Sequence, residues 1–268
     1  MEYSAVRQIC VGVWFNRSLD ERLLLMYESY FDDSRDRTSI IVAGWAASAD
    51  KWLSFEDEWR RHLALYNLPY FHMKEFGKNG VFAHAWGDDR QRYCDFLQGC
   101  AAIIKKHVNF GISRGVFLDE YDAANLECGI KFKVGPAYST CGVLAASRAQ
   151  KRGISAGFEA AYIRHHFDDP GKNKGKAELD RLFESVGLPT NPQFEKSEKD
   201  KKPIPLQAAD FLAWEHRYLL GQFDEFGPLD PDDMHRSLRH LNSIPNDSQM
   251  LAGKENIVAF CRNPHSLC

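Results

Sequence analysis

Apolar residues in the first third of the chain follow a pattern typical of two strands and a long helix. RLLLMYESYFD (22–32) and RTSIIVAGWAA (37–47) are rich in aliphatic, β-branched and aromatic residues, and the short polar link between them suits a hairpin. We therefore expect an antiparallel strand pair. Beyond it Ser48 can cap a helix. Its apolar positions recur at helical spacing and are core candidates: Trp52, Phe55, Trp59, Leu63 and Tyr66.

The middle of the chain continues with helical and strand patterns. A second helix carries Tyr93, Phe96, Leu97, Cys100 and Ile104 on one side, and residues 106–117 alternate like a third strand. Later segments are expected as helices at about 118–127, 136–151 and 177–186, strands at 158–169 and 191–197, and a last helix begun by prolines near 203.

This order predicts an α/β fold: a mixed five-stranded sheet flanked by helices, with a helical insertion at about 48–106 between the second and third strands. Residues 21–220 are expected to form one domain. Residues 1–20 show no clear period and are expected to be an N-terminal extension. Residues 221–268, with turn-rich stretches and one expected helix, are interpreted as a C-terminal appendage packed on the same domain.

Composition narrows the class of protein. The chain has 268 residues, of which 44% are hydrophobic, enough for a sizeable core. No apolar run approaches the roughly 18 to 20 residues of a membrane helix, and the N-terminus lacks a signal-peptide pattern, so we expect a cytoplasmic protein. Seven scattered cysteines without a CxxC indicate reduced thiols and neither a disulfide framework nor a zinc knuckle.

The net charge of −3 gives no overall attraction to nucleic acid, but lysines are concentrated in two segments, GKNKGK (171–176) and EKSEKDKK (195–202). Such runs are most often solvated loops. The alternative is contact with a phosphate backbone, for which Lys172, Lys174 and Lys176 are the candidates.

Acidic residues stand at three element ends where water should be scarce: Asp32 and Asp33 after the first strand, Asp168 and Asp169 after the fourth, and Asp210 in the last helix. Asp210 lies four residues after Leu206 and four before Trp214, on or beside an apolar stripe. A buried carboxylate needs a partner, which could be the helix N-terminus, Gln207 or a cation. Several acids converging favour a hard divalent cation such as Mg²⁺.

Four short motifs resemble a family. They are YFDDS (30–34), YFHMKEF (70–76), HHFDD (165–169) and PLQAADFLAWE (205–215), and the resemblance spans about residues 24–220. The chain resembles the uncharacterised family catalogued as domain of unknown function number thirty-eight hundred, which is grouped with the ribonuclease H-like superfamily. The last motif, LQxAD, is the most specific of the four.

The resemblance implies a ribonuclease H-like nuclease that uses Mg²⁺ or Mn²⁺ to hydrolyse DNA or RNA. It implies that the metal ligands are Asp32, Asp33, Asp168 and Asp210. Asp33 stands where the family more often has Glu. Arg35 replaces the family's usual turn Gly, so a turn needing positive φ would be costlier here.

Three histidines are further candidates. The resemblance places His72 near the cleft, where it could contact a phosphate or transfer a proton, although a lone His after an aromatic residue is more often a packed one. His165 and His166 could bind a transition metal together with the neighbouring aspartates. Strand alternation sends His166 and Asp168 to one face and the other pair to the opposite face, so all four cannot bind one ion.

Two functions remain open from the sequence. The first is a metal-dependent nuclease in which Asp32, Asp168, Asp210 and His72 are catalytic and Gln207 and the lysines of 171–176 contact the substrate. The second is a nuclease-like fold that is weakly active or inactive and only binds a nucleic acid or a protein.

Overall fold

A hairpin of two long strands forms the centre of the fold. The computed structural model describes residues 26–76, 80–87, 89–171, 175–196, 202–226, 239 and 241–263. In it β1 (Tyr27–Arg35) pairs antiparallel with β2 (Ser39–Ser48), which confirms the predicted pair. β3 (Phe110–Phe117) extends the antiparallel sheet beyond β2, and β4 (Ile163–Asp168) and β5 (Gln193–Glu195) add parallel strands beyond β1.

The mixed sheet has six strands, in the order β5-β4-β1-β2-β3-β6, where the sequence predicts five. The additional strand, β6 (Asn246–Met250), pairs parallel with β3 and comes from the segment interpreted as an appendage. Its residues, NDSQM, contain a single apolar side chain, and none of the five is fully buried. An edge strand of this kind carries no apolar alternation, so its sequence could not predict it.

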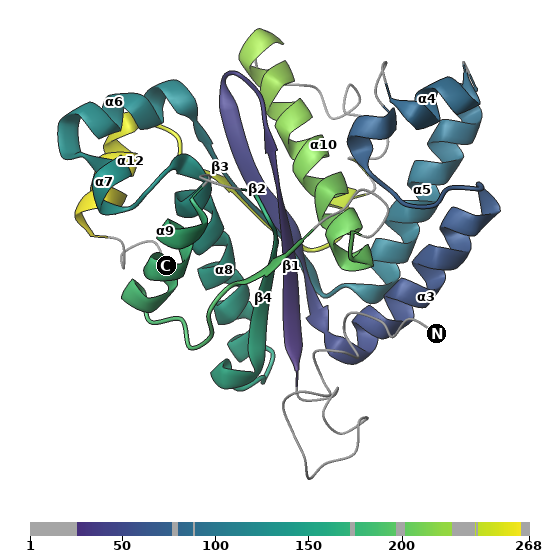
Figure 1. The fold of residues 1–268 in the computed structure, drawn as a ribbon, viewed down its shortest axis with the longest axis horizontal. Helices are drawn as coiled ribbons and strands as arrows, with labels where there is room; N and C mark the ends of the chain where they lie inside the picture. Colours follow the sequence, from purple (N-terminus) through teal and green to yellow (C-terminus); the bar gives the residue numbers. More distant parts are fainter. Residues whose placement is uncertain are drawn as a thin grey trace.

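Helices cover both faces of the sheet (Figure 1). One layer consists of α3 (Ala49–Leu65), η1 (Met73–Phe76), α4 (Val81–Trp86), α5 (Arg90–His107) and α10 (Ile204–Phe226). The opposite layer consists of α6 (Leu118–Cys128), α7 (Ile130–Lys133), α8 (Ala137–Ser155), α9 (Lys176–Ser185) and α12 (Lys254–Arg262). A short turn, η2 (Ala160–Tyr162), leads into β4. None of the described helices is long and apolar enough to cross a membrane.

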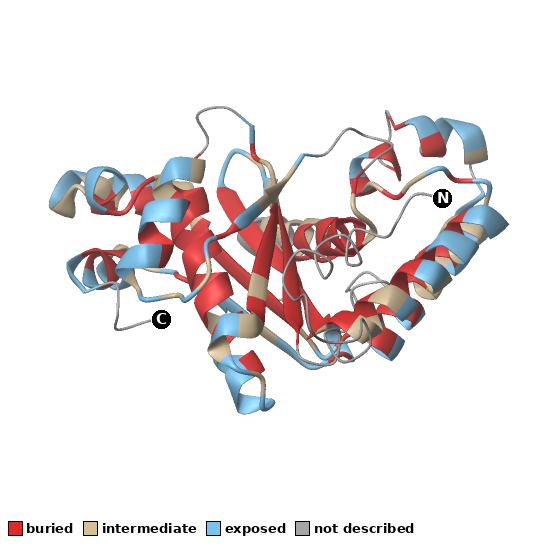
Figure 2. Cartoon of the chain, turned by 60° about the horizontal axis from the view of Figure 1, so that its bottom comes forward, coloured by how far each residue is buried: buried red, intermediate tan, exposed pale blue. Residues whose placement is uncertain are grey.

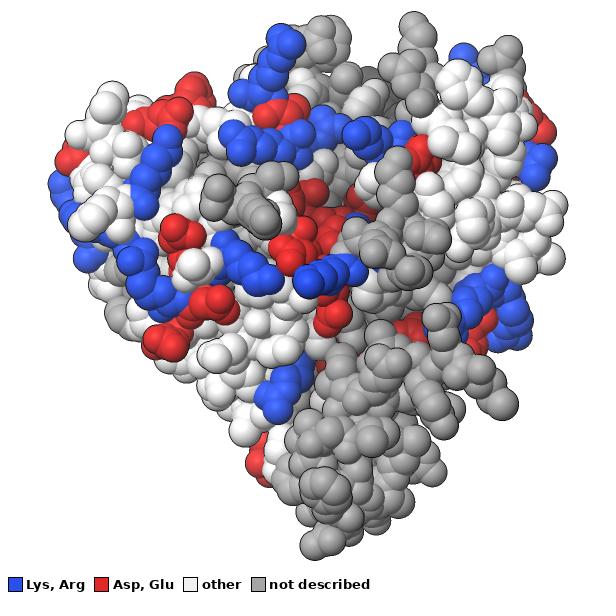
Figure 3. Space-filling view, viewed as in Figure 1, with Lys and Arg blue, Asp and Glu red and all other residues white. Residues whose placement is uncertain are grey.

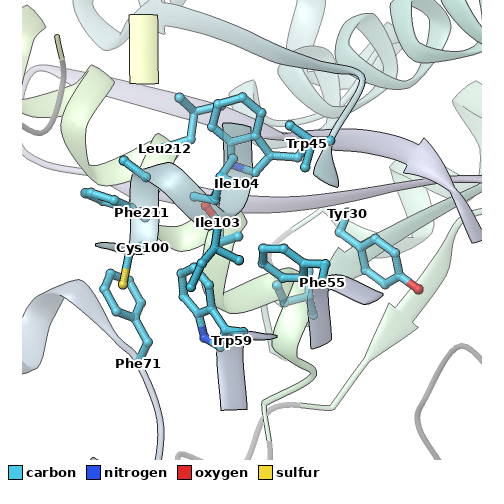
Figure 4. Close-up of a cluster of buried hydrophobic side chains, with 14 of the residues drawn as sticks. Tyr30, Trp45, Phe55, Trp59, Phe71, Cys100, Ile103, Ile104, Phe211 and Leu212 are labelled. Carbon is cyan, nitrogen blue, oxygen red and sulfur yellow. The ribbon is translucent and has the colours of Figure 1, made fainter. Parts of the chain in front are cut away.

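The two layers enclose two apolar cores, which Figure 2 shows as buried segments on either side of the sheet. The predicted stripe of α3 is confirmed, because Trp52, Phe55 and Trp59 are fully buried in the core that also contains residues of the sheet and of α10. Figure 4 shows Phe55 and Trp59 among these side chains. Neighbouring residues of β1 enter different cores: Tyr30 packs in the α3 and α10 layer, and Phe31 packs in the α8 layer. Alternation along β1 therefore decides which helix layer each following acid faces.

The hairpin turn does not need the glycine that the family resemblance implies. Among the described residues, the only non-glycine with positive φ is Asn67, so Arg35 is not strained. Instead, Asp36 forms the turn, and its Oδ1 accepts hydrogen bonds from the backbone N–H groups of Thr38 at 2.9 Å and Ser39 at 2.8 Å. The expectation of a costly turn was wrong because an Asx turn replaces the positive-φ turn.

Because Gly44 in β2 has no side chain, the backbone of β1 at Tyr30 can lie close to it. A Cβ at Gly44 would lie 1.8 Å from the backbone oxygen of Tyr30. We expect Gly44→Ala to lower the free energy of unfolding by about 3 kcal/mol, because a backbone atom cannot move aside as a side chain can. Urea unfolding followed by circular dichroism measures this loss. Gly221→Ala in α10 is the control, since an added Cβ there meets nothing within 4 Å, and equal losses would contradict the packing argument.

Candidate functional site

A buried lysine joins two of the predicted acids. The Nζ atom of Lys202 donates hydrogen bonds to Asp32 Oδ2 at 2.6 Å and to Asp168 Oδ2 at 2.9 Å. The Lys202 side chain is only 6% exposed, and those of Asp32 and Asp168 are 7% and 18% exposed. Two carboxylates from different strands therefore share one cationic group away from bulk water.

The topology of the sheet explains why these two acids meet. β1 and β4 are parallel neighbours, and Tyr30 lies beside His166 in their register. Two residues further on, Asp32 lies just beyond the last pair of this ladder and Asp168 is the last residue of β4, and both extend from the same face. Lys202 lies two residues before α10, the helix that packs on this face of β1 and β2. The structure thus brings Asp32 and Asp168 together as the sequence predicts.

Asp210 lies in α10 and is 8% exposed. Its Oδ2 accepts a hydrogen bond from the backbone N–H of Met73 at 2.6 Å, and its Oδ1 lies 3.9 Å from Nε2 of His72. His72 belongs to the segment that follows α3, and these contacts hold that segment against α10. His72 is partly exposed, with 31% of its side chain accessible, and it lies on the rim of the acidic cluster.

Burial and mutual repulsion govern the charges of this cluster. Burial raises the pKa of Asp32; Lys202 lowers it in part, and the carboxylates of Asp210 and Asp168 raise it further. Burial by itself would lower the pKa of Lys202, but Asp32, Asp210 and Asp168 outweigh burial and raise it above its ordinary value. Lys202 is therefore a charged ammonium that offsets the repulsion among the acids.

Asp33 lies on the other face of the sheet, as alternation along β1 requires. It lines a groove of about 510 Å³ on the α8 side, together with Arg35, Arg37, Lys131 and Tyr138. The resemblance implies that Asp33 is a metal ligand with Asp32, but the two carboxylates leave opposite faces of β1. Asp33 therefore belongs to the groove, and Asp32 belongs to the cluster around Lys202.

Tyr138 shows that the groove and the cluster are close. Its hydroxyl is buried and has no hydrogen-bond partner among the residues that the structure describes. Burial raises the pKa of Tyr138, and the carboxylates of Asp33, Asp32 and Asp168 raise it further. Tyr138 thus lines the groove beside the acids and carries a hydroxyl that no described residue bonds. From the sequence, Tyr138 is expected in a helix, and no functional role is predicted for it.

Basic side chains border the acids, and Figure 3 shows Asp and Glu gathered near the centre of this face with Lys and Arg around them. Arg35 and Arg37 are exposed and, within the described part of the chain, neither has an ion-pair partner. Lys131 pairs with Asp122 at 2.6 Å. The hairpin tip therefore presents two unpaired guanidinium groups beside the groove.

The lysine segments predicted from the sequence are only partly described. Lys172 and Lys174 lie outside the described residues. Lys176 pairs with Asp169 at 3.2 Å, and its Nζ lies 4.4 Å from the centre of the Phe194 ring. Lys202, from the second segment, holds the acidic cluster instead of facing outward. Nothing in the sequence distinguishes it from the neighbouring lysines of the run.

Gln207 supports the site from within. Its Oε1 accepts hydrogen bonds from Trp59 Nε1 at 3.1 Å and from the backbone N–H of Phe71 at 2.9 Å. Its Nε2 donates to the backbone oxygen of Lys202 at 2.9 Å. Both polar atoms of the Gln207 amide are therefore bonded to other residues of the protein. From the sequence, Gln207 is instead expected to contact the substrate.

His165 and His166 face opposite sides of the sheet, as predicted. His165 lies between Ser29 at 2.8 Å and Gln150 at 3.0 Å, and burial lowers its pKa to about 3. His166 stacks on Tyr30, and its Nδ1 lies 3.1 Å from Glu195 Oε1. Within the described residues, no group of three or more His, Cys, Asp and Glu side chains is arranged to hold a metal ion.

Comparisons with known proteins add no relative of this chain. Searches against protein-family models, curated proteins and solved structures gave no match. The family resemblance therefore rests on the sequence motifs alone.

The buried bridge makes a prediction about stability. Lys202→Met leaves Asp32 and Asp168 without their shared cation, so we expect the free energy of unfolding to fall by about 3 kcal/mol. Adding Asp32→Asn to Lys202→Met removes one of the stranded charges and should recover part of this loss. Denaturant unfolding of the single and double variants at neutral pH measures both effects.

The control is Lys106→Met, which breaks an exposed pair with Glu58 and should cost less than about 1 kcal/mol. A Lys202→Met protein as stable as the wild type would show that the bridge contributes nothing.

Proposed function

We propose that this protein is a divalent-metal-dependent phosphodiesterase that acts on a nucleic acid. The observation that carries the proposal is the convergence of Asp32 and Asp168, where the parallel pairing of β1 and β4 ends, on one cationic position. Asp210 acts on the same position, since its charge raises the pKa of Lys202. Two carboxylates that converge on one cation, with a third acid nearby, are the kind of oxygen donors that such an enzyme uses.

The donor set fits Mg²⁺ or Mn²⁺ in its chemistry. Asp32 and Asp168 each direct an oxygen to the point where the Lys202 ammonium lies, so they would hold the ion. Asp210 is nearby, but its Oδ2 is bonded to the N–H of Met73, so water or substrate oxygens would complete the coordination. A bound ion would supply a Lewis acid for the phosphodiester and an activated water for attack.

The residues around the acids suit the handling of a phosphate. His72 is partly exposed beside Asp210, where it would contact a phosphate oxygen or donate a proton to the leaving group. The Tyr138 hydroxyl, buried and without a partner in the described structure, is a second donor near the acids. Arg35 and Arg37 would pair with backbone phosphates in the groove.

The ribonuclease H-like assignment is part of the same proposal. Three antiparallel strands, followed by helix-linked parallel strands β4 and β5 and then by α10, give the order that the family resemblance implies. The acids of that resemblance lie at the ends of β1 and β4 and in α10. Agreement between motif positions and strand order supports this fold family more strongly than either does separately.

Metal binding and cleavage test the proposed activity. Saturating Mn²⁺ should raise the melting temperature by several degrees, because a ligand that binds only the folded state stabilises it by mass action. Asp32→Asn removes one of the two carboxylates that would hold the ion, so it should remove most of this shift and abolish cleavage of nucleic acid. The measurements are thermal unfolding with Mn²⁺ or EDTA, and incubation with single- and double-stranded DNA and RNA.

Asp180→Asn is the matched control, since Asp180 is an exposed aspartate on α9 and is not among the acids of the cluster. A wild-type melting curve that saturating Mn²⁺ leaves unchanged would contradict the metal site. Salt-sensitive binding without cleavage would favour the alternative of a nuclease-like binding module.

The groove makes a separate prediction about binding. Replacing Arg35 and Arg37 with Gln should weaken binding to nucleic acid and flatten its salt dependence, by about 0.9 in slope for each phosphate that is no longer neutralised. Affinity measured across a salt series tests this expectation. Arg60→Gln with Arg61→Gln on α3 removes the same charge elsewhere. Equal effects of the two double variants would show that only total charge matters.

A further inference from the structure

We infer that Lys202 is a resident cation that competes with the divalent metal ion, so that the metal binds only when the Lys202 side chain leaves Asp32 and Asp168. The inference rests on the proposed function, because it concerns the same metal site. It assigns to Lys202 control over metal binding.

The geometry makes the two cations mutually exclusive. The Nζ atom lies 2.6 Å from Asp32 Oδ2 and 2.9 Å from Asp168 Oδ2. A Mg²⁺ ion would bind carboxylate oxygens at about 2.0 to 2.1 Å. An ion bound to these same two oxygens would lie almost on top of the ammonium, in a site where little water screens their repulsion.

The backbone of Lys202 is held by contacts that do not involve its side chain. The Lys202 backbone oxygen accepts a hydrogen bond from Gln207, which is itself bonded to Trp59 and to the backbone of Phe71. The four-carbon stem of a lysine has several rotatable bonds. Release of the ammonium from the carboxylates therefore breaks none of the hydrogen bonds that Gln207 makes.

The exchange has a consequence for charge. The cluster contains three acids and one ammonium, so when all three acids are ionised their negative charge exceeds the charge of Lys202. When a divalent ion replaces the ammonium at the carboxylates, the charge opposite them rises. The released ammonium stays tethered at the start of α10, beside the site, where a phosphate group of the substrate is a suitable partner.

Metal affinity tests the competition directly. Calorimetric titration with Mn²⁺ should give Lys202→Met an affinity at least about tenfold higher than that of the wild type, because no ammonium has to be displaced. Lys202→Arg keeps the charge and should not gain affinity. Lys176→Met is the matched control: it removes a lysine paired with the adjacent Asp169, so it reports the general effect of lost positive charge.

Chemical labelling of the wild type provides a second test that does not depend on a variant. Lys202 is 7% exposed, so an amine-acetylating reagent should modify it slowly. Saturating Mn²⁺ should speed its labelling severalfold, measured by peptide mass spectrometry, while the exposed Lys106 reacts at a constant rate.

Three results would overturn the inference. Lys202 does not compete if folded Lys202→Met binds Mn²⁺ no more tightly than the wild type does. The same conclusion follows if Lys176→Met gains as much Mn²⁺ affinity as Lys202→Met. Labelling of Lys202 that Mn²⁺ leaves unchanged would show that the side chain stays in place. In these cases a wild type that binds Mn²⁺ would leave the proposed function standing; absence of Mn²⁺ binding in every protein would overturn both.

Discussion

The ammonium of Lys202 is the interaction on which the candidate site depends. It joins the ends of β1 and β4 to the segment that begins α10, and these three parts lie far apart in the sequence. Without a cation, buried carboxylates from neighbouring strands would repel each other, because low solvent access strengthens like-charge repulsion. The parallel pairing of β1 and β4 and the docking of α10 can therefore coexist with ionised acids at this position only if a positive charge lies between them.

Alternation along β1 separates this charge cluster from the groove. Asp32 faces α10 with Tyr30, whereas Asp33 faces α8 with Phe31. Two adjacent acids thus serve different surfaces, the first binding a cation and the second lining a basic groove. Tyr138, whose pKa is raised by acids from both surfaces, lies close to the two. The strand end is where a substrate in the groove would come nearest to the buried acids.

The spacing of apolar residues along the chain predicted those helices and strands whose position depends on burying one of their own faces. The stripe of Trp52, Phe55 and Trp59 has helical spacing, and the apolar run of β2 fits a strand buried on both faces. β6 escaped prediction because an exposed polar strand is defined by its pairing with β3. The role of Lys202 was not predicted because its partner Asp32 lies 170 positions away, and the sequence around a lysine in a charged run does not indicate that it is buried.

The burial of the sheet face that packs against α10 explains where the site lies along β1. Earlier in β1, Glu28 is completely buried, and burial raises its pKa and favours the neutral form. Its Oε2 accepts a hydrogen bond from the Tyr30 hydroxyl at 2.9 Å, so its polar needs are met partly within the protein. Asp32 lies two residues beyond Tyr30, where Asp168 and Lys202 can reach it and the partly exposed His72 is nearby. A carboxylate deeper in this face would be kept neutral, and one further out would be solvated, so the strand end is where buried acids can hold and exchange a cation.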